Sequence, residues 1–127
     1  MSETYLAPIL CALLLDGTSE ARQPYAAGYD LTYVKVDCVT DTHVVEVGLD
    51  KRSSYDSLHQ ALFAAHLTGL TPMVVMIDTD GREGPAEYQV KVTADIAGVE
   101  YRVYDRDFLL RWQMTQWLRS YRAAPGS

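Results

Sequence analysis

The segment "YDLTYVKVDCVTDTHVVEVGL", residues 29–49, decides the fold that this sequence predicts. Two runs rich in β-branched and aromatic residues, 29–37 and 43–49, flank the short stretch "CVTD" at 38–41. Such runs favour strands, and a short connection between them favours an antiparallel hairpin. The sequence therefore predicts a β-hairpin whose second strand carries one carboxylate, Glu46, among apolar residues.

The segments after the hairpin alternate between helical and strand patterns. Serine caps and an apolar stripe predict a helix over about 54–68 that ends at Gly69. The continuous apolar run at 72–77 is typical of a strand buried on both faces, so we expect 73–78 to be central in the sheet. Segment 85–98 alternates like a strand in part, but its first proline and last glycine favour a helix.

The two ends of the chain complete the order of elements. Apolar residues at helical spacing predict a first helix over roughly 5–15, which begins near Tyr5 because proline fits only the first turn. A short strand near 20–25 follows, and the chain closes with a strand near 99–105 and a helix after it. This order predicts a single α/β domain over 1–122, a mixed sheet flanked by helices, with a disordered tail at 123–127.

Composition limits the possible functions. The formal net charge of −6 means that no global positive field attracts nucleic acid or an anionic membrane, so DNA binding would need a local patch or a metal. The longest apolar run, 5–15, is too short to span a bilayer and lacks signal-peptide features, so we expect no membrane association and a cytoplasmic location. Cys11 and Cys38 have no metal-site or redox spacing, and we expect buried free thiols rather than a disulfide.

The first helix, the acid-bearing hairpin, the next helix and the buried fourth strand resemble the core of the PD-(D/E)XK nuclease superfamily. That superfamily includes Holliday-junction resolvases and RecB-type nucleases, and the resemblance covers about residues 5–80. It implies a restriction-endonuclease-like sheet and a magnesium ion held by Asp30 of "GYDLTYV" and Glu46 of "VVEVG". Magnesium prefers carboxylate oxygens and activates water for phosphodiester cleavage. Gly48 stands where the family carries a lysine, so the resemblance implies a magnesium-dependent DNA-acting nuclease or a non-cleaving relative.

Strand register decides which side chains join Glu46, because a shift of one residue moves a strand's side chains to the other face. With an odd-length loop centred on Thr40, Val34 lies opposite Glu46, and Asp30 shares its face. With an even-length loop, Lys35 lies opposite Glu46 and Asp37 lies diagonally.

Other segments supply further candidates for the site. Lys51, five residues after Glu46, could replace the absent lysine, and Gln60 resembles a glutamine on the corresponding helix of the family. The candidate catalytic residues are therefore Asp30, Lys35, Glu46, Lys51 and Gln60, and the candidate metal ligands are Asp30, Asp37 and Glu46.

A second interpretation needs no metal. Glu46 could form a structural ion pair with Lys35 or Arg22, because a carboxylate inside an apolar strand is costly to bury alone. The chain would then be a protein-interaction or regulatory module. The C-terminal helix, with Trp112 and Trp117 on a wide apolar arc, is a candidate homodimer contact. The "DTDG" at 78–81 favours a tight turn over a phosphatase aspartate loop.

Overall fold

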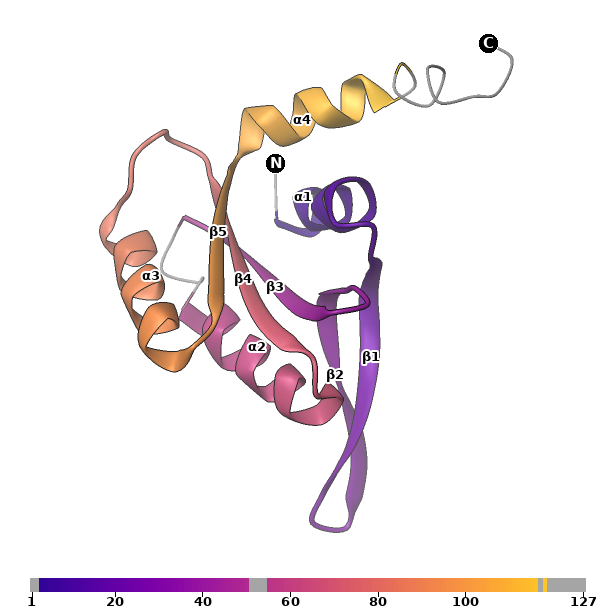
Figure 1. Cartoon of the computed structure of the whole chain (residues 1–127). Helices are drawn as coiled ribbons and strands as arrows, with labels where there is room; N and C mark the ends of the chain where they lie inside the picture. The colour runs from indigo at the N-terminus through magenta and orange to yellow at the C-terminus, as the bar shows by residue number, and fades with distance from the viewer. Residues whose placement is uncertain (1–2, 51–54, 117, 119–127) are drawn as a thin grey trace.

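Five strands form one sheet in the order in which they occur along the chain (Figure 1). Strands β1 (Thr18–Ala27), β2 (Asp30–Val39) and β3 (His43–Leu49) form an antiparallel meander. Strands β4 (Thr71–Asp78) and β5 (Glu100–Asp105) run parallel to β3. This computed structural model describes residues 3–50, 55–116 and 118. The predicted mixed α/β sheet is confirmed.

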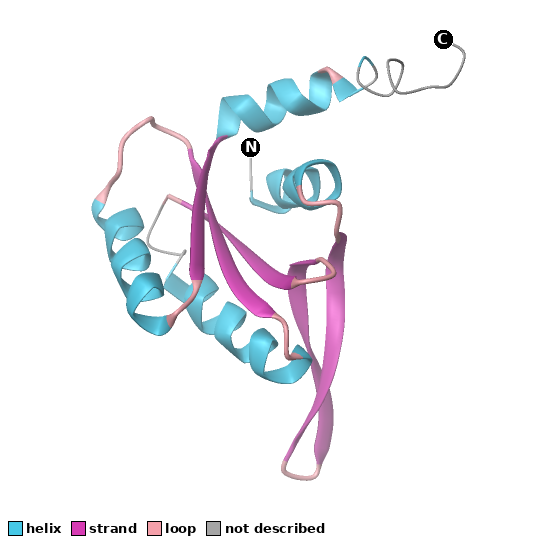
Figure 2. Cartoon of the chain, viewed as in Figure 1, coloured by secondary structure: helices cyan, strands magenta, loops and turns pink. Residues whose placement is uncertain are grey.

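Helices cover both faces of the sheet (Figure 2). On one face lie α1 (Glu3–Ile9), its π-helical continuation η1 (Leu10–Leu14) and α4 (Arg106–Met114). On the other face lie α2 (Tyr55–Thr68) and α3 (Pro85–Ala97). Within residues 3–50, 55–116 and 118, no helix is long and apolar enough to cross a membrane.

Strand β4 is the centre of the core, as its apolar sequence predicts. Met73, Val75 and Ile77 pack toward α1 and α4, whereas Val74 and Met76 pack toward α2 and α3. All five side chains are buried. A strand with helices on both sides cannot show alternating polarity, because neither of its faces meets water.

The predicted helix over 85–98 is also confirmed. Pro85 is the first residue of α3, and Gly98 ends it in the left-handed conformation with φ of 72°. Proline suits a first turn because the first N–H groups of a helix need no intrahelical acceptor, and glycine adopts positive φ without strain.

The first helix differs from its prediction. It begins at Glu3, so that Pro8 lies inside it, and the chain continues as the π-helix η1. The wider turn is visible in the bond from the Leu15 N–H to the Leu10 carbonyl at 3.1 Å. Proline lacks an N–H donor and crowds the preceding turn, which disfavours a regular α-helix around it.

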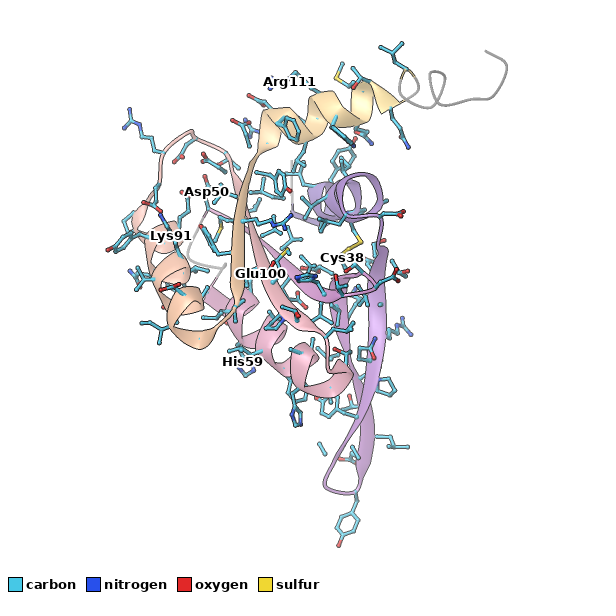
Figure 3. The ribbon with its side chains drawn as sticks, viewed as in Figure 1. Cys38, Asp50, His59, Lys91, Glu100 and Arg111 are labelled. Carbon is cyan, nitrogen blue, oxygen red and sulfur yellow. A yellow bond between two sulfur atoms is a disulfide. The ribbon has the colours of Figure 1, made fainter. Side chains whose placement is uncertain are left out.

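Cys11 and Cys38 form a disulfide that joins η1 to β2 (Figure 3). Both side chains are fully buried, as predicted, but the expectation of free thiols is wrong. The two cysteines are 27 residues apart, and the packing of η1 on β2 brings them together. Gly17 allows this approach, because a Cβ at that position would lie 2.5 Å from the Cys38 sulfur.

Candidate functional site

The register of β2 against β3 brings Asp37 next to the strand segment that carries Glu46 and Val47. The two strands pair through Cys38 with Val45 and Val39 with Val44, so the next position would set Asp37 opposite Glu46. Neither predicted register is correct. The loop has an even number of residues, as in the second predicted register, but it is shorter than that register requires.

Thr40 closes this turn. Its N–H donates to the His43 carbonyl at 2.9 Å, and its hydroxyl accepts from the N–H groups of Thr42 and His43. These local bonds leave only two residues between the closing pair, which shifts the ladder by two positions from the register expected for an even-length loop. Side-chain capping of the turn therefore decides which aspartate approaches Glu46.

Asp37 leaves the regular ladder at this point. Its Oδ2 accepts a hydrogen bond from the Val47 N–H at 2.8 Å, so the Asp37 carboxylate lies against the residue that follows Glu46. On its other side, the β1–β2 ladder omits the pair of Glu20 with Asp37, and Glu20 has φ of 54°. Such an irregularity redirects a side chain at a strand, as β-bulges do.

Glu46 lies at the middle of β3 and is 1% exposed. It pairs across β3 and β4 with Val74. The two cations suggested as its partners have other contacts in the structure. Lys35 Nζ lies 3.9 Å from Glu20 Oε1, and the Arg22 guanidinium lies 4.7 Å from the centre of the Tyr33 ring.

The structure does not bring Asp30 to Glu46. Asp30 is exposed at the start of β2, where it pairs with Ala27 at the far end of the β1–β2 hairpin. Asp37 lies seven positions after Asp30, which corresponds to about 23 Å of strand at about 3.3 Å per residue. A magnesium ion cannot span that distance, because its ligand oxygens lie about 2.1 Å from it.

The other candidate residues are dispersed. Lys35 is exposed on the hairpin, two residues from Asp37. Gln60 is exposed on α2 and lines a groove against the hairpin rather than the surroundings of Glu46. Lys51, Trp117 and the predicted tail at 123–127 lie outside the described residues.

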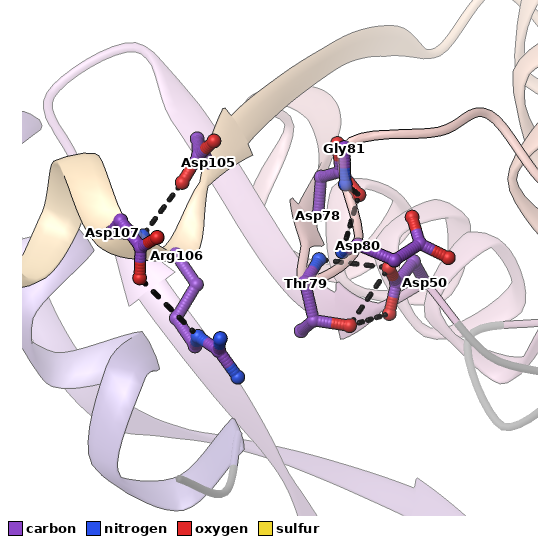
Figure 4. Close-up of polar contacts among 8 residues, drawn as sticks. All are labelled: Asp50, Asp78, Thr79, Asp80, Gly81, Asp105, Arg106 and Asp107. Carbon is purple, nitrogen blue, oxygen red and sulfur yellow. Dashed lines mark hydrogen bonds and ion pairs between the residues drawn. The ribbon is translucent and has the colours of Figure 1, made fainter.

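A second acidic group lies at the carboxyl ends of β3 and β4 (Figure 4). Asp50 follows β3, Asp78 ends β4, Asp80 lies in the next turn, and Glu87 lies in the first turn of α3. One oxygen of each lies within 4.8 Å of the others. Sequence reasoning missed this group, although an acid directly after each of two parallel strands was the signal available for it.

Hydrogen bonds hold two of these carboxylates, Asp50 and Asp78, in place. Thr79 donates to Asp50 from its N–H and from its hydroxyl, each at 2.8 Å. Asp78 Oδ1 accepts from the N–H groups of Asp80 and Gly81, both at 3.1 Å. The predicted tight turn at 78–81 is therefore confirmed, with Gly81 at φ of 75°.

Burial, hydrogen bonds and nearby charges shift the pKa values of Glu87, Asp78 and Asp50. Burial raises the pKa of Glu87, and the nearby negative charges of Asp78, Asp50 and Asp80 raise it further. Burial also raises the pKa of Asp78. For Asp50, burial acts in the same direction, but hydrogen bonds, led by those from Thr79, outweigh it and lower the pKa.

The same negative charge extends to a neighbouring tyrosine. Burial, followed by the charges of Glu87, Glu83 and Asp78, raises the pKa of Tyr101 to about 12. This end of the sheet is therefore strongly acidic, in contrast to the hairpin end.

Comparison with protein-family models, with curated proteins and with solved structures finds no match for this chain.

Proposed function

We propose that this chain is a PD-(D/E)XK-like, magnesium-dependent DNA nuclease whose metal ligands are Asp37 and Glu46. The main support is the hydrogen bond from the Val47 N–H to Asp37 Oδ2 at 2.8 Å, because it holds the Asp37 carboxylate beside the strand position of Glu46. The order of a helix, three antiparallel strands, a helix and a parallel strand supports the same resemblance. Asp37 replaces Asp30 as the expected first ligand.

The donor set suits magnesium. Two carboxylates from adjacent strands supply hard oxygen ligands, and Asp37 keeps its second oxygen beyond the one bound to Val47. The Val47 N–H orients the Asp37 carboxylate, as hydrogen-bond donors to metal ligands do at metal sites. Bound magnesium would lower the pKa of a coordinated water, the nucleophile for phosphodiester cleavage.

A second carboxylate near Glu46 adds repulsion between like charges, which a divalent cation bound to both would relieve. Gly48 has no side chain to supply the family's lysine, so Lys51 or Lys35 would have to supply that charge.

The rival interpretation is a metal-independent interaction module. The observation that favours it is the 1% exposure of Glu46, because a fully enclosed carboxylate suits a structural role in an acidic chain. Homodimerisation through the C-terminal helix belongs to this interpretation, with Met114 73% exposed on α4. That contact, DNA binding and a cytoplasmic location all stay predictions.

Three variants separate the two interpretations. Asp37→Asn and Glu46→Gln each remove a ligand charge and keep side-chain shape, and Asp80→Asn does the same in the acidic cluster at the end of β4. We expect the first two to lower cleavage of labelled single-stranded, duplex or branched DNA by roughly 100-fold or more. Asp80→Asn should retain wild-type cleavage.

Melting temperature with and without magnesium gives an independent readout. At ten times its Kd, a bound ion stabilises the wild type by about 1.4 kcal/mol, and this gain should vanish in Asp37→Asn and Glu46→Gln. Loss of the gain in Asp80→Asn alone would assign the ion to the other cluster. No cleavage, no magnesium effect and a stability loss of a few kcal/mol in Glu46→Gln would support the module instead.

A further inference from the structure

The β1–β2 hairpin projects beyond the rest of the sheet (Figure 1). Its ladder runs as far as the pair of Ala27 with Asp30, whereas the pairing of β2 with β3 stops near Cys38. The end of this hairpin, residues 28–31, is called the tip below. It carries two large apolar side chains in solvent, Tyr29, which is fully exposed, and Leu31, which is 86% exposed. Exposed apolar residues gathered on one projecting element indicate a contact surface.

A groove of about 470 Å³ lies between the body of the same hairpin and α2. Phe63 forms its aromatic floor with Tyr25, the two ring centres being 4.9 Å apart in an edge-to-face arrangement. Among the described residues, the side chains that line it carry no fixed charge; they are Tyr25, Tyr33, Val34, His59, Gln60 and Phe63. The groove therefore suits an apolar or aromatic group with a polar end.

We propose that the occupant of this groove is the hairpin tip of a second copy of this chain, so that two copies exchange tips across a two-fold axis. The tip and the groove belong to one hairpin, and Tyr29 and Tyr33 are four residues apart, or about 13 Å of strand. If two hairpins cross antiparallel about an axis midway between these points, each tip meets the other copy's groove. Such an interface is self-complementary and closes at two copies.

The area available is enough for a weak dimer. A buried aromatic side chain removes about 150–250 Å² of surface from water. Each copy contributes its own tip, with Tyr29 and Leu31, and its own groove, so the surface buried on each copy is about 500 Å². The total of about 1,000 Å² lies below the range of about 1,200–2,000 Å² for stable specific interfaces, among weak and transient ones. We therefore expect a dimer that dissociates on dilution.

Charge favours contact at this hairpin over other surfaces. Each chain carries a formal charge of −6, so two copies repel one another at long range. Within residues 18–36, however, Arg22 and Lys35 balance Glu20 and Asp30, so the hairpin is neutral. The acidic group at the ends of β3 and β4 lies at the other end of the sheet from the tip.

Sedimentation velocity of the full chain over a range of concentrations tests the dimer. Tyr29→Ser and Leu31→Ser should each weaken dimerisation at least tenfold. They should leave the melting temperature of the monomer unchanged, because both side chains are exposed. Ile96→Ser is the matched control, since Ile96 is 81% exposed on α3, away from the hairpin. Equal association of wild type and Tyr29→Ser, or loss of the dimer in Met114→Ser alone, would overturn the proposal.

Cross-linking tests which surfaces meet. Tyr29→Cys and Gln60→Cys are prepared separately and mixed under mild oxidation; the native cysteines are buried in their disulfide. The proposal requires a disulfide between one chain of each variant. Cross-links within the Tyr29→Cys sample alone would indicate tip-to-tip contact and overturn it. Binding of a dT oligonucleotide in the groove while the chain stays monomeric would also overturn the proposal, because the groove would then hold nucleobases. DNA cleavage by a monomeric Tyr29→Ser would leave the proposed nuclease activity intact.

Discussion

Reduction of the Cys11–Cys38 disulfide is a direct test of how the first helix is held to the sheet. The disulfide closes a loop of 27 residues between η1 and β2. Chain-entropy arguments give about 3.5 kcal/mol for a loop of this size at 25 °C. Because small domains are stable by only about 5–15 kcal/mol, we expect reduction to remove a large share of the stability.

Urea unfolding of the oxidised protein and of the same protein with reductant measures this difference without any substitution. The midpoint should fall on reduction, and the double variant Cys11→Ala with Cys38→Ala should show no response to reductant. Thiol titration of the unfolded, unreduced protein should find no free thiol. Two free thiols per chain, or a change in unfolding free energy below about 1 kcal/mol, would refute the argument.

The disulfide also bears on the proposed metal site. Cys38 is the direct neighbour of Asp37, whose carboxylate binds the Val47 N–H. Reduction should therefore weaken the magnesium-dependent rise in melting temperature as well as the stability. If reduction leaves the magnesium response unchanged, the position of Asp37 does not depend on the disulfide.

Two further substitutions test the packing and the charges of the fold. Gly17→Ala would place a Cβ 2.5 Å from the Cys38 sulfur and 2.9 Å from the Val39 carbonyl oxygen, so urea unfolding should show a loss of about 1–3 kcal/mol. Equal stability of this variant would contradict the close approach. The raised pKa of Glu87 means that the folded state holds its proton more tightly than the unfolded state, so stability should fall as pH rises from the ordinary glutamate pKa through the raised value. Glu87→Gln should flatten this part of the curve of stability against pH, and a slope identical to that of the wild type would exclude Glu87 as its source.

Local patterns were enough to predict the elements and their order. The apolar run of β4 predicts a strand buried on both faces, and the structure buries Met73 through Ile77 between two layers of helices. Pro85 and Gly98 correctly predict the bounds of α3, although the residues between them alternate like a strand. These features depend on near neighbours in the chain, whose geometry is set by backbone and side-chain chemistry at that position.

Only the tertiary structure decided which distant residues meet. Thr40 tightens the β2–β3 turn and thereby brings Asp37, not Asp30, to β3, where it binds the N–H of the residue after Glu46. The packing of η1 on β2 joins Cys11 to Cys38, and the parallel alignment of β3 with β4 gathers Asp50 with Asp78. Composition and spacing do not by themselves determine these contacts. Each depends on a register or a packing angle, and a shift of one residue or of a few ångströms would select different partners.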